Sequence, residues 1–212
     1  MDLEFNQLFD EWASCYDETV LGKDREYEEV FAQYEQILTT VANKASGCVL
    51  EFGVGTGNLT KKLLTNGKTV YGVEPSKGMR EIAQQKLPTA KIIQGDFLNF
   101  EIPETPIDTI VSTYAFHHLK DNEKGQALNK YRKILKNSGK IVFADTVFLN
   151  EAAKEQKIRE AESNGFDRLV QDLKTEYYTT ISTMRRLFEE NKFSVSFVQM
   201  NPFVWLIEGK IM

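Results

Sequence analysis

The stretch Val49-Leu50-Glu51-Phe52-Gly53-Val54-Gly55-Thr56-Gly57 indicates the fold of this 212-residue chain. An apolar run that starts at Cys48 leads into three alternating glycines, and the apolar positions after Asn58 recur at helical spacing. The pattern predicts a strand, a tight turn and a helix. Because glycine permits positive φ and lets a ligand approach the backbone, the turn can be a ligand-binding site. The alternative is a tight strand-to-helix turn that binds no ligand.

Strands and helices alternate along the sequence that follows this turn. Helices are expected at 58–65, 76–87 and 121–135, and strands at 69–73, 90–94, 107–113 and 140–144, the last one entered through a turn at Gly139. Such alternation predicts an α/β fold with a doubly wound, mostly parallel sheet that helices cover on both faces.

The two ends of the chain have different patterns. Apolar residues at helical spacing predict N-terminal helices, first at Phe5, Leu8, Phe9, Trp12, Ala13 and Tyr16 and then at Tyr27, Val30, Phe31, Tyr34, Ile37, Leu38 and Val41. Beyond the fifth strand, helices are expected at 151–173 and 180–190 and strands at 194–200 and 203–211. The short turn Asn201-Pro202 has no room for a crossover helix, so these two strands must pair antiparallel.

The composition limits the classes of partner. With 26 basic and 31 acidic residues, the net charge is −5, which does not favour nucleic acid as a partner. The two cysteines, Cys15 and Cys48, are in no metal-binding spacing, so no metal site is expected. Since no signal peptide and no apolar run of about 20 residues is found, no membrane association and a cytoplasmic location are expected.

The spacing of the glycines discriminates between nucleotide ligands. A dinucleotide fingerprint GxGxxG that begins at Gly53 would require glycine at position 58, where the chain has Asn58. The GK[ST] ending of a phosphate-binding P-loop is also absent. The pattern GxGxG after the acidic Glu51 instead suits a cofactor that carries no pyrophosphate.

Two carboxylates follow the next two strands. Glu74, 21 residues after Gly53 and at the end of a strand, can accept hydrogen bonds from both hydroxyls of a ribose, or it can complement the start of the helix after it. Asp96, in Gly95-Asp96-Phe97, could accept from an adenine amino group beside the aromatic ring, although Gly-Asp turns end many strands.

These segments together resemble the class I S-adenosylmethionine-dependent methyltransferases. Leu135-Lys136-Asn137-Ser138-Gly139-Lys140 is similar to that class's turn before the fifth strand, with Asn137 and Ser138 in place of proline and glycine. From end to end the chain also resembles the uncharacterised YrrT-type methyltransferases of low-GC Gram-positive bacteria. The resemblance implies S-adenosylmethionine as cofactor and a seven-stranded sheet in the order 3-2-1-4-5-7-6 with the last strand antiparallel.

The resemblance also implies a division of the chain and a role for individual residues. We expect a single domain with N-terminal helices over 1–45, a cofactor-binding core over 46–146, a helical insertion over 147–180, and a C-terminal helix and hairpin over 181–212. The glycine loop would pass under the methionine part of the cofactor, the ribose would lie on one strand-end carboxylate, and the adenine would lie beside the other. The residues implied in cofactor binding are Tyr16, Glu51, Gly53, Gly55, Gly57, Glu74, Asp96, Phe97 and Thr113. For Tyr16 the alternative is that it completes the apolar face that begins at Phe5.

The segment from Ser112 to Leu119, after the fourth strand, is expected to lie where the methyl acceptor binds. It holds both histidines of the chain and resembles the "HHL" loop of small-molecule methyltransferases. His117 is therefore a candidate base for an acceptor that must lose a proton, and Asp145 at the end of the fifth strand is a second candidate. The alternatives are that the histidines pack or cap the next helix and that Asp145 starts a helix.

The leading hypothesis is thus a methyltransferase with a small-molecule acceptor. A nicotinamide-dependent oxidoreductase and a cofactor-binding protein without transferase activity are the alternatives. The segment from Phe148 to Tyr178 is predicted to form a lid over the acceptor, with Tyr177 and Tyr178 able to point into the site. A helix pair docked permanently on the sheet edge is the other interpretation of this segment.

Overall fold

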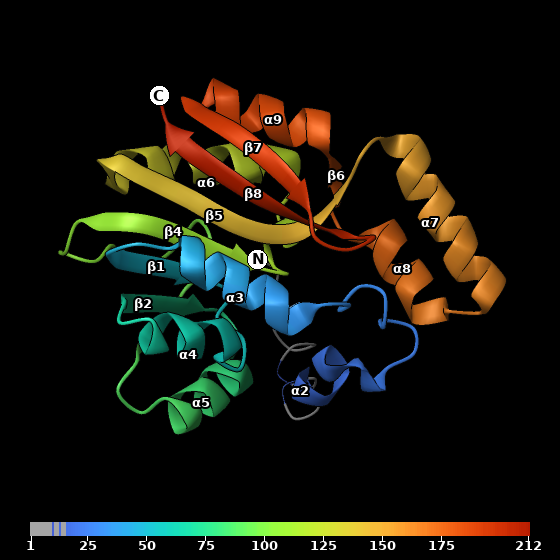
Figure 1. Cartoon of the computed structure of the whole chain (residues 1–212), viewed down its shortest axis with the longest axis horizontal. Helices are drawn as coiled ribbons and strands as arrows, with labels where there is room; N and C mark the ends of the chain where they lie inside the picture. Colours follow the sequence, from blue (N-terminus) through green and yellow to red (C-terminus); the bar gives the residue numbers. More distant parts are fainter. Residues whose placement is uncertain (1–9, 11–12, 14–15) are drawn as a thin grey trace.

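The computed structural model describes residues 10, 13 and 16–212, which form one sheet with helices around it (Figure 1). Of the residues that predicted the first N-terminal helix, Phe5, Leu8, Phe9 and Trp12 lie outside the described residues, as does Cys15. The helical elements are α2 (Tyr16–Glu18), η1 (Thr19–Lys23), α3 (Tyr34–Lys44), α4 (Asn58–Thr65), α5 (Lys77–Lys86), η2 (Phe116–His118), α6 (Asp121–Ile134), α7 (Glu151–Asn164), α8 (Asp167–Thr175) and α9 (Ile181–Glu190). The strands are β1 (Cys48–Phe52), β2 (Thr69–Glu74), β3 (Lys91–Gln94), β4 (Ile107–Thr113), β5 (Leu135–Phe148), β6 (Thr179–Thr180), β7 (Phe193–Gln199) and β8 (Val204–Ile211).

The strand order of the sheet is β3-β2-β1-β4-β5-β8-β7. β1 lies in the middle, where Val49 pairs in parallel with Val70 of β2 and Thr109 of β4. β8 runs antiparallel to both β5 and β7. The doubly wound fold, the strand order and the reversed last strand predicted from the sequence are confirmed. The short strand β6, which pairs with β5, had no sequence signal.

Helices cover both faces of the sheet (Figure 1). On one face α3 and α4 pack through Ile37, Leu38 and Leu63, and on the other face α6 and α9 pack through Tyr131 and Phe188. Every residue of β1 is buried because both of its faces are covered. No helix in the described part of the chain is long and apolar enough to cross a membrane.

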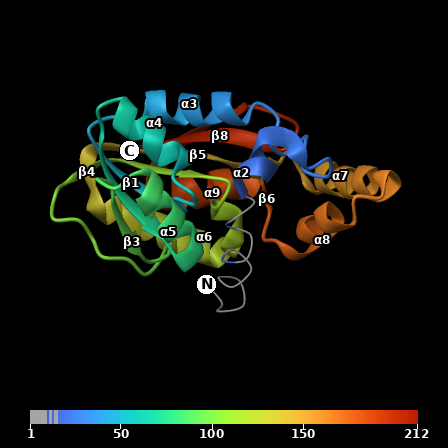
Figure 2. The same cartoon turned by 90° about the horizontal axis from the view of Figure 1, so that it is seen from below.

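The parallel strands end at one edge of the sheet, and the segments that matter for function gather there. The glycine loop follows β1, Glu74 ends β2, and η2 follows β4. β5 leads into α7 and α8, which extend beyond the sheet at the same end as α2 (Figures 1 and 2). A ligand at this edge would therefore lie between the loops of the core and the helical insertion.

Two helix predictions are wrong in part. α3 begins only at Tyr34, because Gln33 before it has a left-handed φ of 62°, so Tyr27 to Phe31 lie in turns. The helix predicted over 151–173 is two helices, because Gly165 has a φ of 68° and ends α7. The amide of Phe166 then donates to the carbonyl of Ala161 at 3.0 Å and closes the end of α7.

The prediction of a turn at Gly139 before the fifth strand is also wrong, because Gly139 lies inside β5. β5 already begins at Leu135, which pairs with Ile107, and regular pairing resumes where Lys140 meets Thr109. The extra residues between these pairs form a bulge within the strand. The sequence pattern marked the place of this irregularity but assigned it to a turn before the strand.

Candidate functional site

A cavity lies at the carboxyl ends of the parallel strands, where the core meets the insertion. Its lining includes many of the residues singled out in the sequence, namely Tyr16, Gly53, Gly55, Glu74, Asp96, Phe97, Thr113 and His117. Among the described residues, Glu51, Gly57 and Asp145 lie outside this lining. The fold therefore brings most of the predicted site residues to one place.

The glycine loop approaches the cavity through two of its three glycines. Gly53 has a φ of 67°, and a Cβ on it would lie 2.7 Å from the Cβ of Ala115. Gly55 has a φ of 57°, and a Cβ on it would meet only the ring of Tyr16, at 4.0 Å. Gly57 has a φ of 89° and precedes α4. Any other residue would be strained at these positions, so the loop can present its backbone directly to a ligand.

Glu74 holds the glycine loop and lines the cavity at the same time. Its Oε2 accepts from the amide of Gly55 at 2.8 Å, and its Oε1 accepts from the amide of Ser76 at 2.9 Å. Burial raises the pKa of Glu74 to about 7, against these backbone donors, which favour the charged form. A ligand that donates hydroxyls to this carboxyl would find it already oriented.

Glu51 lies beneath the loop rather than in the cavity. Its side chain is 1% exposed and accepts a hydrogen bond from the hydroxyl of Thr60 in α4 at 2.7 Å. Burial raises the pKa of Glu51 to about 8, although the Thr60 bond lowers it. Through this hydrogen bond, Glu51 of β1 holds α4 in place.

Asp96 and Phe97 follow β3 and are part of the cavity lining. Oδ1 of Asp96 accepts from the amides of Leu98 at 2.7 Å and Asn99 at 2.8 Å, so the side chain closes its own turn. The ring of Phe97 stacks on Phe52 at a centroid distance of 5.3 Å and is buried. Both residues line the cavity while they also stabilise the loop.

The N-terminal segment is attached to the glycine loop by a residue that the sequence did not single out. Oδ1 of Asp17, next to Tyr16 in α2, accepts from the hydroxyl of Thr56 at 2.6 Å and from the side-chain amide of Asn58 at 3.0 Å. Asp17 also pairs with Lys86 of α5. These contacts fix α2 where the Tyr16 ring lines the cavity, and no local motif around Asp17 could have indicated them.

His117 and Asp145, predicted as acceptor-side candidates, form a buried pair. Nδ1 of His117 lies 2.6 Å from Oδ1 of Asp145, and the backbone amide of His117 donates to Oδ2 at 2.9 Å. Burial lowers the pKa of His117, but the charge and the hydrogen bond of Asp145 outweigh it, so the pKa is raised. Because Asp145 holds Nδ1, the ring presents Nε2 away from Asp145, and the ring stacks on Tyr178 at 4.8 Å.

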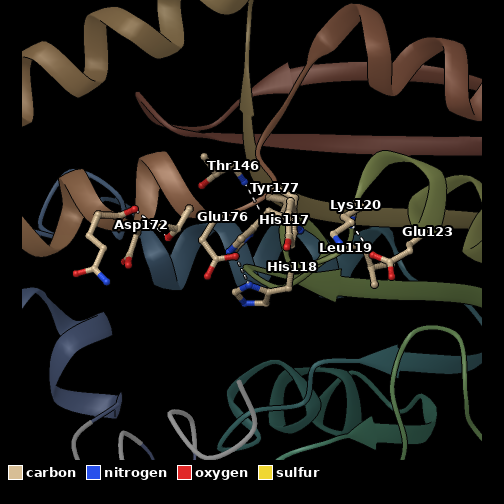
Figure 3. Close-up of polar contacts among 12 residues, drawn as sticks. His117, His118, Leu119, Lys120, Glu123, Thr146, Asp172, Glu176 and Tyr177 are labelled. Atoms are coloured by element: carbon tan, nitrogen blue, oxygen red, sulfur yellow. Dashed lines mark hydrogen bonds and ion pairs between the residues drawn. The ribbon is translucent and has the colours of Figure 1, made fainter. Parts of the chain in front are cut away.

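His118 forms a second pair, with a residue of the insertion (Figure 3). Its Nδ1 lies 3.0 Å from Oε2 of Glu176, which follows α8. Burial and the charge of His117 lower the pKa of His118 to about 4, while the His118 contact holds the pKa of Glu176 below its usual range despite burial. Both residues line the cavity, and the two imidazole rings are 4.1 Å apart.

Other residues of the acceptor end were only partly foreseen. Of the two tyrosines predicted to point inward, Tyr178 lines the cavity, whereas Tyr177 is 44% exposed and is not part of the lining. Tyr27 and Asp172 were missed, and the Tyr27 hydroxyl donates to Asp172 at 2.5 Å. Tyr114, also in the lining, has a φ of 55° and a buried hydroxyl without a hydrogen-bond partner. A ligand group could satisfy that hydroxyl.

The chain is similar to proteins whose general class is known. Residues 49–139 match a family model described as a methyltransferase domain. An uncharacterised methyltransferase of Geobacillus sp. (strain WCH70) is 59% identical over 210 residues, which are 99% of each chain. A second uncharacterised methyltransferase, from Bacillus cytotoxicus, is 57% identical over the same share of each chain.

Solved structures share the fold at low identity. A Thermotoga maritima protein described as an S-adenosylmethionine-dependent methyltransferase and possible histamine N-methyltransferase superposes with a TM-score of 0.68 at 18% identity, over 97% of this chain and 99% of that one. Magnesium protoporphyrin IX methyltransferase from Synechocystis, with bound S-adenosylhomocysteine, superposes with a TM-score of 0.66 at 16% identity, over 89% and 92%.

Proposed function

The chain belongs to the class I S-adenosylmethionine-dependent methyltransferases, and from that premise we propose that it methylates a small molecule held at the His117 end of the cavity. The observation that carries the proposal is that one cavity is lined by the glycine loop, by Glu74 and by His117. The groups that we propose to bind the cofactor and a group able to act on an acceptor are therefore adjacent. Nothing in the similarities favours a nicotinamide-dependent oxidoreductase.

The residues present fit the cofactor of this family. Gly53 and Gly55 would let the methionine part lie against the backbone, and Glu74 would accept from the ribose hydroxyls. Asp96 and Phe97 would lie beside the adenine, while Tyr16 and Thr113 would complete the site. The unpartnered hydroxyl of Tyr114 leaves a polar group for the ligand to satisfy. We assign no direct cofactor contact to Glu51 or Gly57, because both lie outside the lining.

The acceptor half supports a role for His117 and Asp145. S-adenosylmethionine supplies an activated methyl group, so the protein has to align the acceptor and exclude water. Asp145 would be the positioning residue, because its carboxylate holds Nδ1 of His117 and so turns Nε2 away from itself. His117 would accept the proton of an acceptor that must lose one.

The charged groups that line the cavity support a small acceptor rather than a nucleic acid. Among the described residues the lining includes the carboxylates Glu74, Asp96, Asp172 and Glu176 but no lysine or arginine. A site for nucleic acid would need basic groups for the phosphates, and the whole chain has a net charge of −5. Glu176 and Tyr178, which follow α8, also line the cavity, and the ring of Tyr178 stacks on that of His117.

A thermal-shift titration with S-adenosylhomocysteine, S-adenosylmethionine and NAD tests the cofactor. At about 100 times its dissociation constant, S-adenosylhomocysteine should stabilise the folded protein by ~2.7 kcal/mol through linkage. Stabilisation by NAD alone would contradict the proposal. Transfer of a labelled methyl group to a small acceptor would then separate an enzyme from a protein that only binds the cofactor.

A further inference from the structure

The side chains of His117, His118 and Glu176 meet at the acceptor end of the cavity (Figure 3). Each offers one donor atom for a metal ion, and these atoms lie within 4.8 Å of one another. The two histidines are neighbours in η2, whereas Glu176 follows α8, 58 residues beyond His118. Such a set has no signature in the sequence, where the cysteine spacing indicated no metal site.

From this geometry we propose that His117, His118 and Glu176 bind a divalent transition-metal ion of the zinc type, with an open coordination position that faces the acceptor. The role that we assign to the ion rests on the proposed function, whereas binding of the ion can be measured independently of that function. Two imidazoles and one carboxylate suit zinc and its neighbours, whereas magnesium and calcium prefer all-oxygen sites. Three protein ligands with a remaining position for water or substrate are the usual set of a catalytic zinc ion.

Asp145 is arranged as the outer partner that such sites require. A metal-bound histidine usually donates its other ring N–H to a carboxylate, which fixes the orientation of the ring. His117 meets this condition, because Oδ1 of Asp145 lies 2.6 Å from Nδ1 and Nε2 is turned away from it. Asp145 is itself fixed by the amides of His117 at 2.9 Å and Thr146 at 2.8 Å.

The distances permit an ion after a small movement. Bonds of about 2.0–2.2 Å from one ion place its ligands roughly 3–3.5 Å from each other, so the present cluster has to contract slightly. Nδ1 of His118 and Oε2 of Glu176 are already 3.0 Å apart. An ion would replace the hydrogen bond between these two atoms and would draw Nε2 of His117 toward them. Because Glu176 caps the end of α8, the ion would also join the insertion to the core.

Metal binding would change what His117 does. In the metal-free protein the ring is the base described above, whereas with an ion bound Nε2 is a ligand. An acceptor hydroxyl or thiol would then bind the open position as its anion, and its proton would pass to solvent. Both states serve an acceptor that must lose a proton, and the ion would in addition hold the reacting atom in place.

Isothermal titration calorimetry on the tag-free, chelator-treated full chain tests the site with ZnCl2 and MnCl2. We expect one ion per chain in the wild type and a loss of affinity of more than 100-fold in Glu176→Gln and in His118→Gln, since each removes one of the three ligands. Asp145→Asn should weaken binding by about 10–100-fold, as outer partners do. Asp172→Asn is the matched control, because it removes a carboxylate from the same cavity outside the set and should keep the affinity.

Bound Co2+ gives a second signal, because its visible absorption reports the ligand geometry. The spectrum should appear in the wild type and in Asp172→Asn and should be absent in Glu176→Gln. No binding by the wild type, or equally tight binding by Glu176→Gln, would overturn the site. The S-adenosylhomocysteine thermal shift of each variant shows that it is folded. A wild type that shows this thermal shift but binds no metal would refute the metal site while the proposed function stands.

Discussion

Two buried carboxyls beside the glycine loop differ in what a ligand can reach. Glu74 lines the cavity and accepts from the amides of Gly55 and Ser76, whereas Glu51 is enclosed with Thr60. Burial raises the pKa of both, to about 7 for Glu74 and to about 8 for Glu51. At the residue scale, therefore, two groups of the same kind are expected to affect cofactor binding very differently.

We predict that Glu74→Gln weakens S-adenosylhomocysteine binding by roughly 2–4 kcal/mol at pH 8, because the amide oxygen of glutamine is a weaker, neutral acceptor and its NH2 group accepts no hydrogen bond from the ribose. In the wild type the affinity should fall as the pH drops below about 7, since a proton then competes for the carboxylate that the ribose hydroxyls need. The decrease is at most about tenfold per pH unit, and this limb should be absent in the variant.

Calorimetry at pH 6, 7 and 8 measures both effects. Glu51→Gln is the matched control, because its carboxyl is buried close by and lies outside the cavity lining. It should keep the wild-type affinity at pH 8. If Glu74→Gln bound the ligand as tightly as the wild type, Glu74 would have only its role in holding the loop.

At the scale of elements, the insertion after β5 has two dissimilar helices. α7 is largely exposed and buries only Ala161, whereas α8 buries Leu169 and Leu173 in the core cluster that includes Phe31 and Phe203. α8 also carries Asp172 into the cavity and ends at Glu176. The two interpretations of this segment, a mobile lid and a permanently docked helix pair, therefore differ mainly in how tightly α8 is held when no ligand is bound.

We predict that α8 and the residues up to Tyr178 behave as the lid. Their backbone amides should exchange with deuterium quickly in the free protein and more slowly when S-adenosylhomocysteine is bound, because the ligand would close the cavity that they line. Hydrogen exchange followed by mass spectrometry measures the change. The amides of α9, which packs on the core away from the cavity, should exchange at the same rate in both states. Strong and equal protection of α8 in both states would identify a docked helix pair.

At the scale of the whole molecule, the antiparallel hairpin is attached through close packing across the sheet. Gly209 of β8 pairs with Ile141 of β5, and a Cβ on it would lie 2.5 Å from the ring of Phe188 in α9. Phe188 is fully buried, so it has little room to move. Glycine at this position lets α9 lie close against β8.

We predict that Gly209→Ala lowers the free energy of unfolding by about 1–3 kcal/mol, the usual cost of overpacking a core. Gly125→Ala is the matched control in α6, where the new Cβ would make an ordinary contact of 3.6 Å with Leu187. That change should stabilise the fold by about 0.5–1 kcal/mol, because alanine is the better helix residue. Urea denaturation measures both variants. A destabilised Gly125→Ala together with an unchanged Gly209→Ala would contradict this view of the packing.

The sequence by itself determined the class of fold, and the family resemblance that its motifs carry implied the strand order and the cofactor. The alternation of strand and helix patterns, the glycine loop and the short turn before the last strand are local features, and each reports on its own element. The assignment of individual site residues and the division into four segments stay predictions. The two helix predictions that are wrong at Gln33 and Gly165 also have a local physical cause. A single residue with a left-handed backbone interrupts a helix, but it leaves the spacing of the apolar residues around it unchanged.

Only the tertiary structure decided which charged groups meet. His117 and Asp145 are 28 residues apart and His118 and Glu176 are 58 apart, yet each pair is within hydrogen-bonding distance. Likewise, nothing in the spacing distinguished the carboxyl of Glu51, enclosed under α4, from that of Glu74, which faces the cavity. The physical reason is that periodicity records which face of an element is buried, whereas the partners of a buried polar group depend on where the fold places distant elements.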